Sequence, residues 1–236
     1  MESVQGAPAG LARAAASALV HATFFALGWI VATGGARGWV RPALIVSAAL
    51  VAACLLSRLS AWGALAYLMV PLIVLRIGGD RVDIRRIGLT APRSIGAVVA
   101  GLGAGAFLGV HLLLSVSLTF GYGVRVVSAG EYLAAVGYDV GANALTAEWL
   151  FRGALFSRCW RSWRFWPAAV FVTALVVVRY LLDPALPPAT EIRAGAVFYM
   201  ALLGLGCCGL RAWSGSLLPG YAATVTFFAA YRLLAT

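Results

Sequence analysis

The sequence predicts an all-α protein, a polytopic bundle of about eight transmembrane helices that forms one integral unit. Hydrophobic residues make up 62% of the 236 residues and charged residues only 11%, whereas about a quarter of the residues in a soluble domain are charged. Lipid is therefore the expected solvent for most of the surface. A membrane-spanning helix needs about 20 apolar residues. The apolar runs that approach this length are 14–34, 40–57, 60–77, 95–119, 137–158, 165–182, 193–211 and 215–234.

These runs divide the chain into three regions. Residues 1–12 are a small, polar N-terminal tail, residues 13–78 are N-terminal transmembrane helices, and residues 79–236 are a larger helical core. No basic segment precedes the first run, which is also long for a signal peptide, so we expect this helix to be retained. Most connectors are short, which predicts antiparallel neighbours. The longest connectors are 78–94, 122–136 and 183–193.

The basic residues predict the orientation of the bundle rather than a nucleic-acid partner. The net charge is +10 and all 18 basic residues are arginine, but they stand singly or in short groups between apolar runs. The odd-numbered connectors carry eleven of them and the opposite side five, so the positive-inside rule places both termini outside. The lysine-free composition rich in Ala, Gly and Arg is typical of a GC-rich bacterial genome, which predicts a bacterial inner membrane. The eleven are Arg37, Arg41, Arg76, Arg81, Arg85, Arg86, Arg93, Arg158, Arg161, Arg164 and Arg211.

Neither a metal nor another cofactor is expected. The four cysteines, Cys54, Cys159, Cys207 and Cys208, have no metal-binding or disulfide spacing, so we interpret them as small packing residues. The only histidines, His21 and His111, lie singly in two apolar runs. Two histidines are too few for a metal site, and each is interpreted as a hydrogen-bonded packing residue.

Small residues recur in the run 95–119, where Gly101, Gly103, Gly105 and Gly109 follow one another closely. Glycine allows close approach of helix backbones in a bilayer, where no hydrophobic force drives helices together. This row predicts a helix-packing surface.

Charged side chains inside apolar runs are the most informative feature. Glu148 and Arg152 are four residues apart, which places them on one face of a helix where they can pair. Arg179 and Asp183 have the same spacing. Charged groups at membrane depth normally face the protein interior and have partners. Spacing alone leaves two interpretations of the first pair: a structural ion pair between helices, or half of an active site with the glutamate as general base.

Three passages resemble the CPBP family (CAAX protease and bacteriocin-processing, or Abi), which consists of glutamic-type intramembrane proteases. Residues 148–155 read E-W-L-F-R-G-A-L and resemble the family's first motif, E-E-x-x-x-R, which commonly ends in F-R-G. Residues 86–92, R-I-G-L-T-A-P, resemble a connector before the family's core. Residues 215–219, G-S-L-L-P, resemble the lead-in to its last motif. The resemblance covers roughly residues 80–235, so the helical core is CPBP/Abi-like.

The resemblance implies a site whose catalytic positions have changed. In the family, a first glutamate and two histidines polarise water, and an asparagine holds the oxyanion. Alignment on the F-R-G motif retains Glu148 and Arg152 but places Ala147 at the first glutamate. The family's F-x-x-x-H motif falls on Val176 and Tyr180, and a slip of one residue would place Arg179 there. The last histidine and the asparagine fall on Thr224 and Phe228.

These departures predict a degenerate member of the family, since alanine, threonine and phenylalanine do not titrate and tyrosine is a poor base at neutral pH. We expect a non-catalytic partner or binding protein in the processing or sorting of membrane-anchored proteins. Its partners would be the lipid bilayer and either an active protease or a membrane-anchored protein or peptide. Two alternatives stay open. One is an active intramembrane endopeptidase in which Glu148 works with His21, His111 or Tyr180; the other is a transporter-like protein.

Overall fold

The computed structural model describes residues 6–35, 38–78, 82–121, 123–124, 128–182 and 189–234. Within these ranges the protein is all-α, as the sequence predicts, apart from one isolated bridge between Val124 and Leu234. The elements in chain order are α1 (Gly6–Thr33), α2 (Val40–Leu59), η1 (Ala61–Leu68), α3 (Met69–Gly78), α4 (Val82–Ile87), α5 (Ile95–Phe120), α6 (Ala129–Tyr138), η2 (Asp139–Ala144), α7 (Leu145–Ala147), η3 (Glu148–Phe156), α8 (Ser157–Ser162), α9 (Phe165–Leu181), α10 (Thr190–Ser214) and α11 (Leu218–Tyr231).

A helical segment lies at each of the eight predicted runs, but not all of these segments are long and apolar enough to span a membrane. In the described part of the chain, five are long and apolar enough to cross a bilayer: 14–33 within α1, α2, 61–78 across η1 and α3, α5 and α10. With 17 and 14 residues, α9 and α11 are shorter. The protein is therefore a helical membrane protein, while the number of eight spans stays a prediction.

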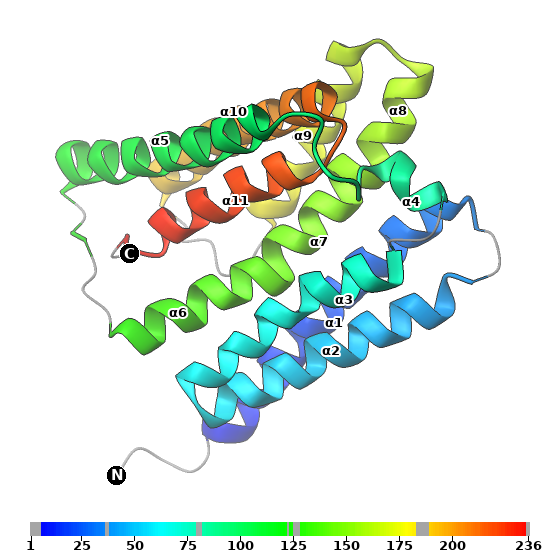
Figure 1. The fold of residues 1–236 in the computed structure, drawn as a ribbon. Coiled ribbons are helices and arrows are strands. Elements are labelled where there is room, and N and C mark those ends of the chain that lie inside the picture. The colour runs from blue at the N-terminus through cyan, green and yellow to red at the C-terminus, as the bar shows by residue number, and fades with distance from the viewer. Residues whose placement is uncertain are drawn as a thin grey trace.

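The helices form two groups on either side of a central helical run (Figure 1). The run extends continuously from residue 129 to 162 through α6, η2, α7, η3 and α8. On one side lie α1, α2 and η1 with α3; on the other lie α5, α10 and α11. At two places, η2 and η3, the central run has wider π-type turns. Such turns are frequent at functional positions, and Glu148 begins the second.

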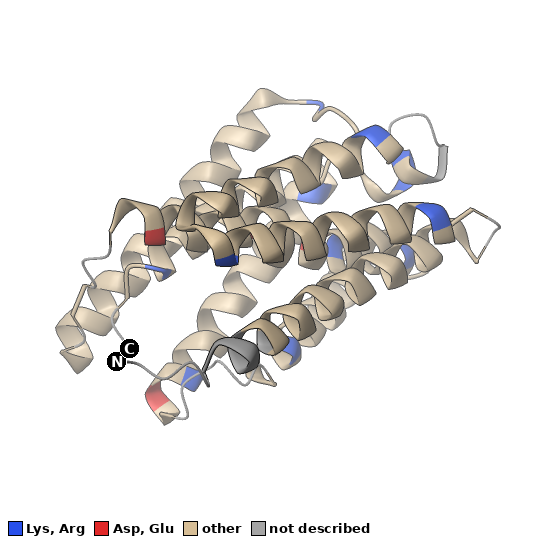
Figure 2. Ribbon diagram, turned by 90° about the horizontal axis from the view of Figure 1, so that it is seen from below, with Lys and Arg blue, Asp and Glu red and all other residues tan. Residues whose placement is uncertain are grey.

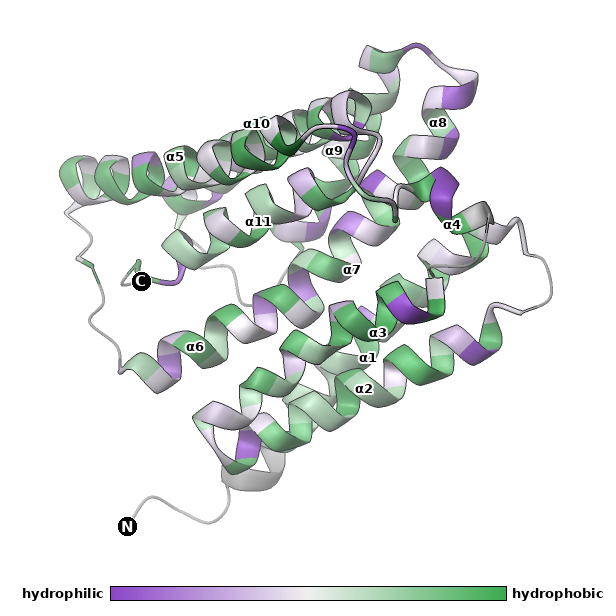
Figure 3. Ribbon diagram, viewed as in Figure 1, coloured by the Kyte–Doolittle hydropathy of each residue, from purple (hydrophilic) through white to green (hydrophobic). Residues whose placement is uncertain are grey.

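The outer surface of the bundle is apolar, as a lipid-facing surface requires. Leu118 is 84% exposed, Leu59 83% and Ile95 80%. Figure 3 shows hydrophobic residues along most of the length of the helices, and Figure 2 shows how few charged residues lie between the helix ends. This distribution agrees with lipid as the surrounding solvent.

Three of the four glycines in the row on α5 pack against α11, as predicted. A Cβ added at Gly101 would collide with the carbonyl oxygen of Pro219, and one at Gly105 would collide with that of Ala223. At Gly109 it would lie 2.5 Å from Ala230 Cβ. Gly103 differs, because a Cβ there would meet nothing within 4 Å. Only glycines on the α11 side permit the close contact.

An aromatic cluster fixes the central run against α1. The rings of Phe25 and Trp29 both stack on Trp149, with centroid separations of 4.9 and 5.6 Å. Gly28 leaves the space that Trp149 occupies, since an added Cβ would clash with the indole ring. Trp149 is the neighbour of Glu148 in the sequence, so this cluster helps set the rotation of η3.

Two predicted connectors contain helices. Within 122–136 the sequence led us to expect a connector, but α6 begins at Ala129. Its start is fixed by a capping box in which Ser128 Oγ accepts from the Glu131 backbone N–H and the Glu131 carboxylate accepts from that of Ser128. This arrangement satisfies backbone donors at a helix start. Within 78–94, α4 is the second unexpected helix. Asp183, the expected partner of Arg179, lies outside the described residues.

Candidate functional site

Glu148 and Arg152 form the ion pair expected from their spacing. Arg152 Nη1 lies 3.1 Å from Glu148 Oε1, and the two residues are 2% and 1% exposed. Both project from η3 into the interior of the protein. A buried charge is costly unless it is paired, so each of these side chains depends on the other.

Thr224 of α11 is a second partner of the same carboxylate. Its hydroxyl donates a 2.8 Å hydrogen bond to Glu148 Oε1 and lies 3.6 Å from Cys207 Sγ of α10. A Cβ added at Gly220 would come within 3.1 Å of Glu148 Oε2, so this glycine lets α11 approach the carboxylate. Among the described residues, Glu148 Oε2 and Arg152 Nε are buried without a hydrogen-bond partner.

The remaining family positions gather around this cluster. Tyr180 and Phe228 face each other, with ring centroids 5.5 Å apart. Ala147 is 1% exposed and belongs to an apolar cluster that contains Val176, against which Tyr180 also packs. The structure therefore brings the positions on the central run, α9 and α11 together. The side chains at these positions carry a methyl group, hydroxyls and aromatic rings, and none of these groups is a base at neutral pH.

A second polar network lies nearby that the sequence analysis missed. Arg232 makes two 2.8 Å hydrogen bonds to the two carboxylate oxygens of Asp139, a bidentate pair. Asn143 Nδ2 donates to Asp139 Oδ1 at 3.1 Å, and Arg179 Nη2 donates to Asn143 Oδ1 at 3.0 Å. Tyr180 Oη lies 3.5 Å from the same Asn143 oxygen. Asp139 and Asn143 are four residues apart inside a predicted helix, so their spacing was the available signal.

A large cavity borders these residues. Its volume is about 1090 Å³, and α1, α5, the central run, α9, α10 and α11 all contribute to its wall. The lining is mostly aliphatic and aromatic. Its polar contributors include His21, Asn143, Arg179, Tyr180 and Arg232. An apolar cavity with a few convergent polar groups is the usual form of a ligand site.

The comparisons with known proteins address the same part of the chain. Residues 129–227 match the family model described as type II CAAX prenyl endopeptidase Rce1-like. Residues 129–227 are thus similar to this family, and we call them the Rce1-like segment. The match begins at the first residue of α6 and contains Glu148, Arg152, Tyr180 and Thr224. It confirms the resemblance to the CPBP family, and it does not include residues 86–92. No curated protein and no solved structure matched the chain.

Two of the passages that carry the resemblance, 86–92 and 215–219, meet at one end of this Rce1-like segment. The Leu217 backbone N–H donates to the Gly88 carbonyl at 2.9 Å, and Ser216 Oγ donates to the Thr90 carbonyl at 2.6 Å. Arg211 Nη2 donates to the Arg86 carbonyl at 2.9 Å and lies 3.4 Å from Ser157 Oγ. Residues 86–92 are thus attached to the Rce1-like segment although they precede it in the sequence.

Neither histidine contacts the Glu148 cluster of the Rce1-like segment. His21 lies 3.0 Å from Thr146 Oγ1 and 2.6 Å from Tyr138 Oη. His111 Nδ1 lies 2.7 Å from Tyr199 Oη. Both are hydrogen-bonded, as expected, and the hydrogen bonds of Glu148 among the described residues involve Arg152 and Thr224.

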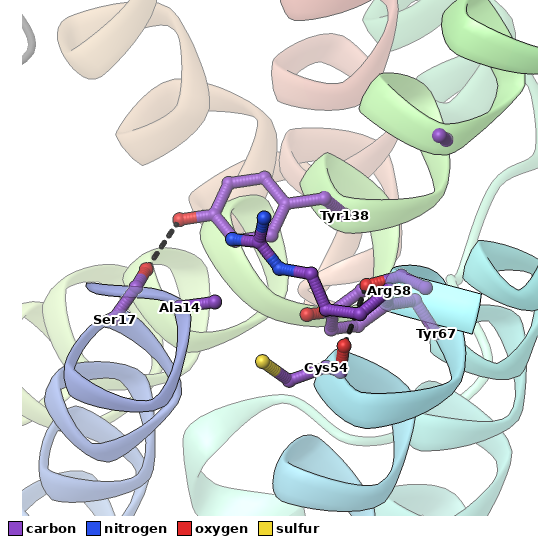
Figure 4. A pocket seen from close by; sticks show the side chains of 8 residues that line it. Ala14, Ser17, Cys54, Arg58, Tyr67 and Tyr138 are labelled. Atoms are coloured by element: carbon purple, nitrogen blue, oxygen red, sulfur yellow. Dashed lines mark hydrogen bonds between the residues drawn. The ribbon is translucent and has the colours of Figure 1, made fainter. Parts of the chain in front are cut away.

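A smaller cavity of about 370 Å³ lies between α1, α2, η1 and α6 (Figure 4). Tyr138 Oη and Ser17 Oγ lie 3.1 Å apart, and these two residues line both this cavity and the larger one. Since His21 bonds the same tyrosine, Ser17, Tyr138 and His21 form a hydrogen-bonded partition between the two spaces.

Proposed function

We propose that this protein is a non-catalytic member of the CPBP family that binds membrane-anchored proteins or peptides and assists their processing or sorting. The observation that carries the proposal is the environment of Glu148. Its Oε1 is shared by Arg152 and Thr224, and Thr224 stands at the position of the family's last histidine. A general base needs an accessible lone pair within reach of a water. Here the carboxylate is buried and acts as an acceptor for its neighbours.

The loss of the other catalytic groups supports the same conclusion. General-base and oxyanion contributions are each worth about 10²–10⁴ in rate. None of Ala147, Tyr180, Thr224 and Phe228 is a general base at neutral pH, and Phe228, at the position of the family's asparagine, offers no donor to an oxyanion. The four residues retain the packing that joins the central run to α9 and α11.

The large cavity is the proposed binding site. Its apolar lining suits the hydrocarbon part of a lipid-linked peptide or one side of a membrane-anchoring helix, and its polar groups suit a peptide backbone. An active protease of the same family is the partner to which a bound anchor would be delivered.

Photo-crosslinking in proteoliposomes tests the binding step. The purified protein is reconstituted with a lipid-linked peptide that carries a photoreactive group. Gly195 lines the cavity on α10 and has open space around it, so Gly195→Phe should reduce crosslinking severalfold by filling the cavity. Gly206→Phe is the matched control, because Gly206 also has open space on α10 but does not line the cavity. Equal crosslinking in both variants contradicts the proposed site.

An active endopeptidase is the second candidate, favoured by one observation: Glu148 Oε2 has no hydrogen-bond partner among the described residues. Incubation of the reconstituted protein with the same peptides, alone and with an active relative, separates the two functions. The non-catalytic proposal predicts no cleavage by the protein alone. Cleavage that Glu148→Gln abolishes in a folded variant would establish the endopeptidase instead.

A further inference from the structure

Residues 158–166 contain an Arg-x-Trp triplet three times in succession: R-C-W, R-S-W and R-F-W. We call residues 158–166 the Arg-Trp turn. It covers most of α8, the bend after it and the start of α9. The sequence has no aspartate or glutamate between residues 149 and 182, so no nearby acidic residue in this segment neutralises the three arginines.

The three arginines and three tryptophans of the repeat face outward. Trp160 is 40% exposed, Trp163 46% and Trp166 66%. The three arginines, Arg158, Arg161 and Arg164, are exposed as well. Large exposed aromatic side chains next to exposed cations are unusual on a surface that faces only water.

The tryptophans are held in place by the helices beneath them. Trp160 stacks on Phe156 with a centroid separation of 5.4 Å, and Trp163 contacts Phe171 edge-on at 5.3 Å. The backbone N–H of Trp163 donates to the Cys159 carbonyl at 2.7 Å, which closes the bend. The repeat is therefore presented on an ordered support.

The Arg-Trp turn also lies at the end of the bundle that collects the most arginines. Arg211 bridges the Arg86 carbonyl and Ser157 Oγ, which brings the end of α4 next to the start of α8. Figure 1 shows α4 and α8 side by side at this end. Tryptophan favours the membrane–water interface, and arginine binds phosphate groups with paired hydrogen-bond donors.

We propose that the Arg-Trp turn binds the headgroups of anionic phospholipids, with the tryptophans at the interface and the arginines on lipid phosphates. Exposed cations close to a negatively charged membrane surface are attracted to it. Because η3 leads directly into α8, this contact would fix the depth of the helix that carries Glu148 and Arg152. The Arg-Trp turn would bind these lipids whether or not the large cavity binds a peptide.

The test uses the full chain in a neutral detergent, and its thermal unfolding is followed after addition of phosphatidylglycerol or phosphatidylcholine. Phosphatidylglycerol should raise the unfolding temperature more than phosphatidylcholine does. The triple change Arg158→Gln, Arg161→Gln and Arg164→Gln should remove this difference. The control triple, Arg41→Gln, Arg58→Gln and Arg193→Gln, removes the same charge from exposed arginines outside α4 and α8 and should keep most of the difference between the two lipids.

A second measurement reports the position of the rings. Phosphatidylglycerol with brominated acyl chains should quench tryptophan fluorescence more than the brominated phosphatidylcholine does, and Trp160→Phe with Trp163→Phe and Trp166→Phe should remove that excess. Equal loss of the unfolding-temperature difference in both arginine triples would overturn the proposal, because it would indicate a general charge effect. No difference between the two lipids in the unmodified protein would also overturn it, and would favour an acidic protein as occupant.

Discussion

Thr224 Oγ1 donates a 2.8 Å hydrogen bond to Glu148 Oε1, which connects two residues 76 positions apart in the sequence. The bond joins α11 to η3 at the point where Arg152 also approaches the carboxylate. The family resemblance implies a histidine at the position of Thr224. In this protein a threonine stands there, and its hydroxyl donates to the carboxylate.

Thr224→Val should destabilise the protein by about 1.5–3 kcal/mol, because a buried hydrogen bond to a charged group is lost while the shape is kept. Thr224→Ser retains the hydroxyl and should lose less. Unfolding in mixed micelles with increasing denaturing detergent measures both. Equal stability of the two variants would show that the hydrogen bond contributes nothing.

Glu148→Ala and Arg152→Ala should each cost about 3–5 kcal/mol, since each leaves the other charge buried and unpaired. The double variant Glu148→Leu with Arg152→Met removes both charges and should recover most of that loss. A double-mutant cycle on unfolding free energies, built from Glu148→Leu, Arg152→Met and the double variant, makes the comparison quantitative. Additive effects of the single changes would contradict a coupled pair.

Gly105→Ala should destabilise the protein by about 1–3 kcal/mol, the usual cost of overpacking, because the new Cβ would collide with the backbone of α11. Gly103→Ala adds the same group to the same helix where there is open space, and its unfolding free energy should be unchanged or slightly higher. The same unfolding assay compares them. Helix propensity favours alanine at both positions, so similar losses at both would contradict a packing effect specific to the α11 side.

The predicted orientation can be tested with reporters fused to the C-terminus. If both termini lie outside, an alkaline phosphatase fusion should be active and a green fluorescent protein fusion dark in bacterial cells, because the first folds only after export and the second only in the cytoplasm. The reverse pattern would place the arginine-rich end outside and contradict the positive-inside assignment.

Much of the fold could be predicted from the sequence, because apolar runs and short connectors report directly on helices in a bilayer. All eight runs correspond to helical segments, and the Gly101, Gly105 and Gly109 contacts follow from their spacing. The helix from Ala129 was missed because its first residues are not part of an apolar run. The Ser128–Glu131 spacing was the signal that would have revealed it.

The site could be predicted only in part. The Glu148–Arg152 pair follows from a separation of four residues, which any helix converts into proximity. The partners of this pair on other helices depend on how α11 is rotated and how far it slides along α5, and no local pattern encodes either. For the same reason, the bidentate pair between Asp139 and Arg232 was not foreseen, although each residue is visible as a charge near an apolar run.

The glycine contacts between α5 and α11 have a consequence for the synthesis of the protein in the cell. The ribosome completes α5 long before α11, with all of the central run, α9 and α10 still to be made. Until α11 has been synthesised and inserted, the glycine surface of α5 that packs against it can be covered only by lipid or by another protein. An insertase or chaperone that shields this face during translation would therefore influence the yield of folded protein, and changes that slow synthesis between the two helices should lower it.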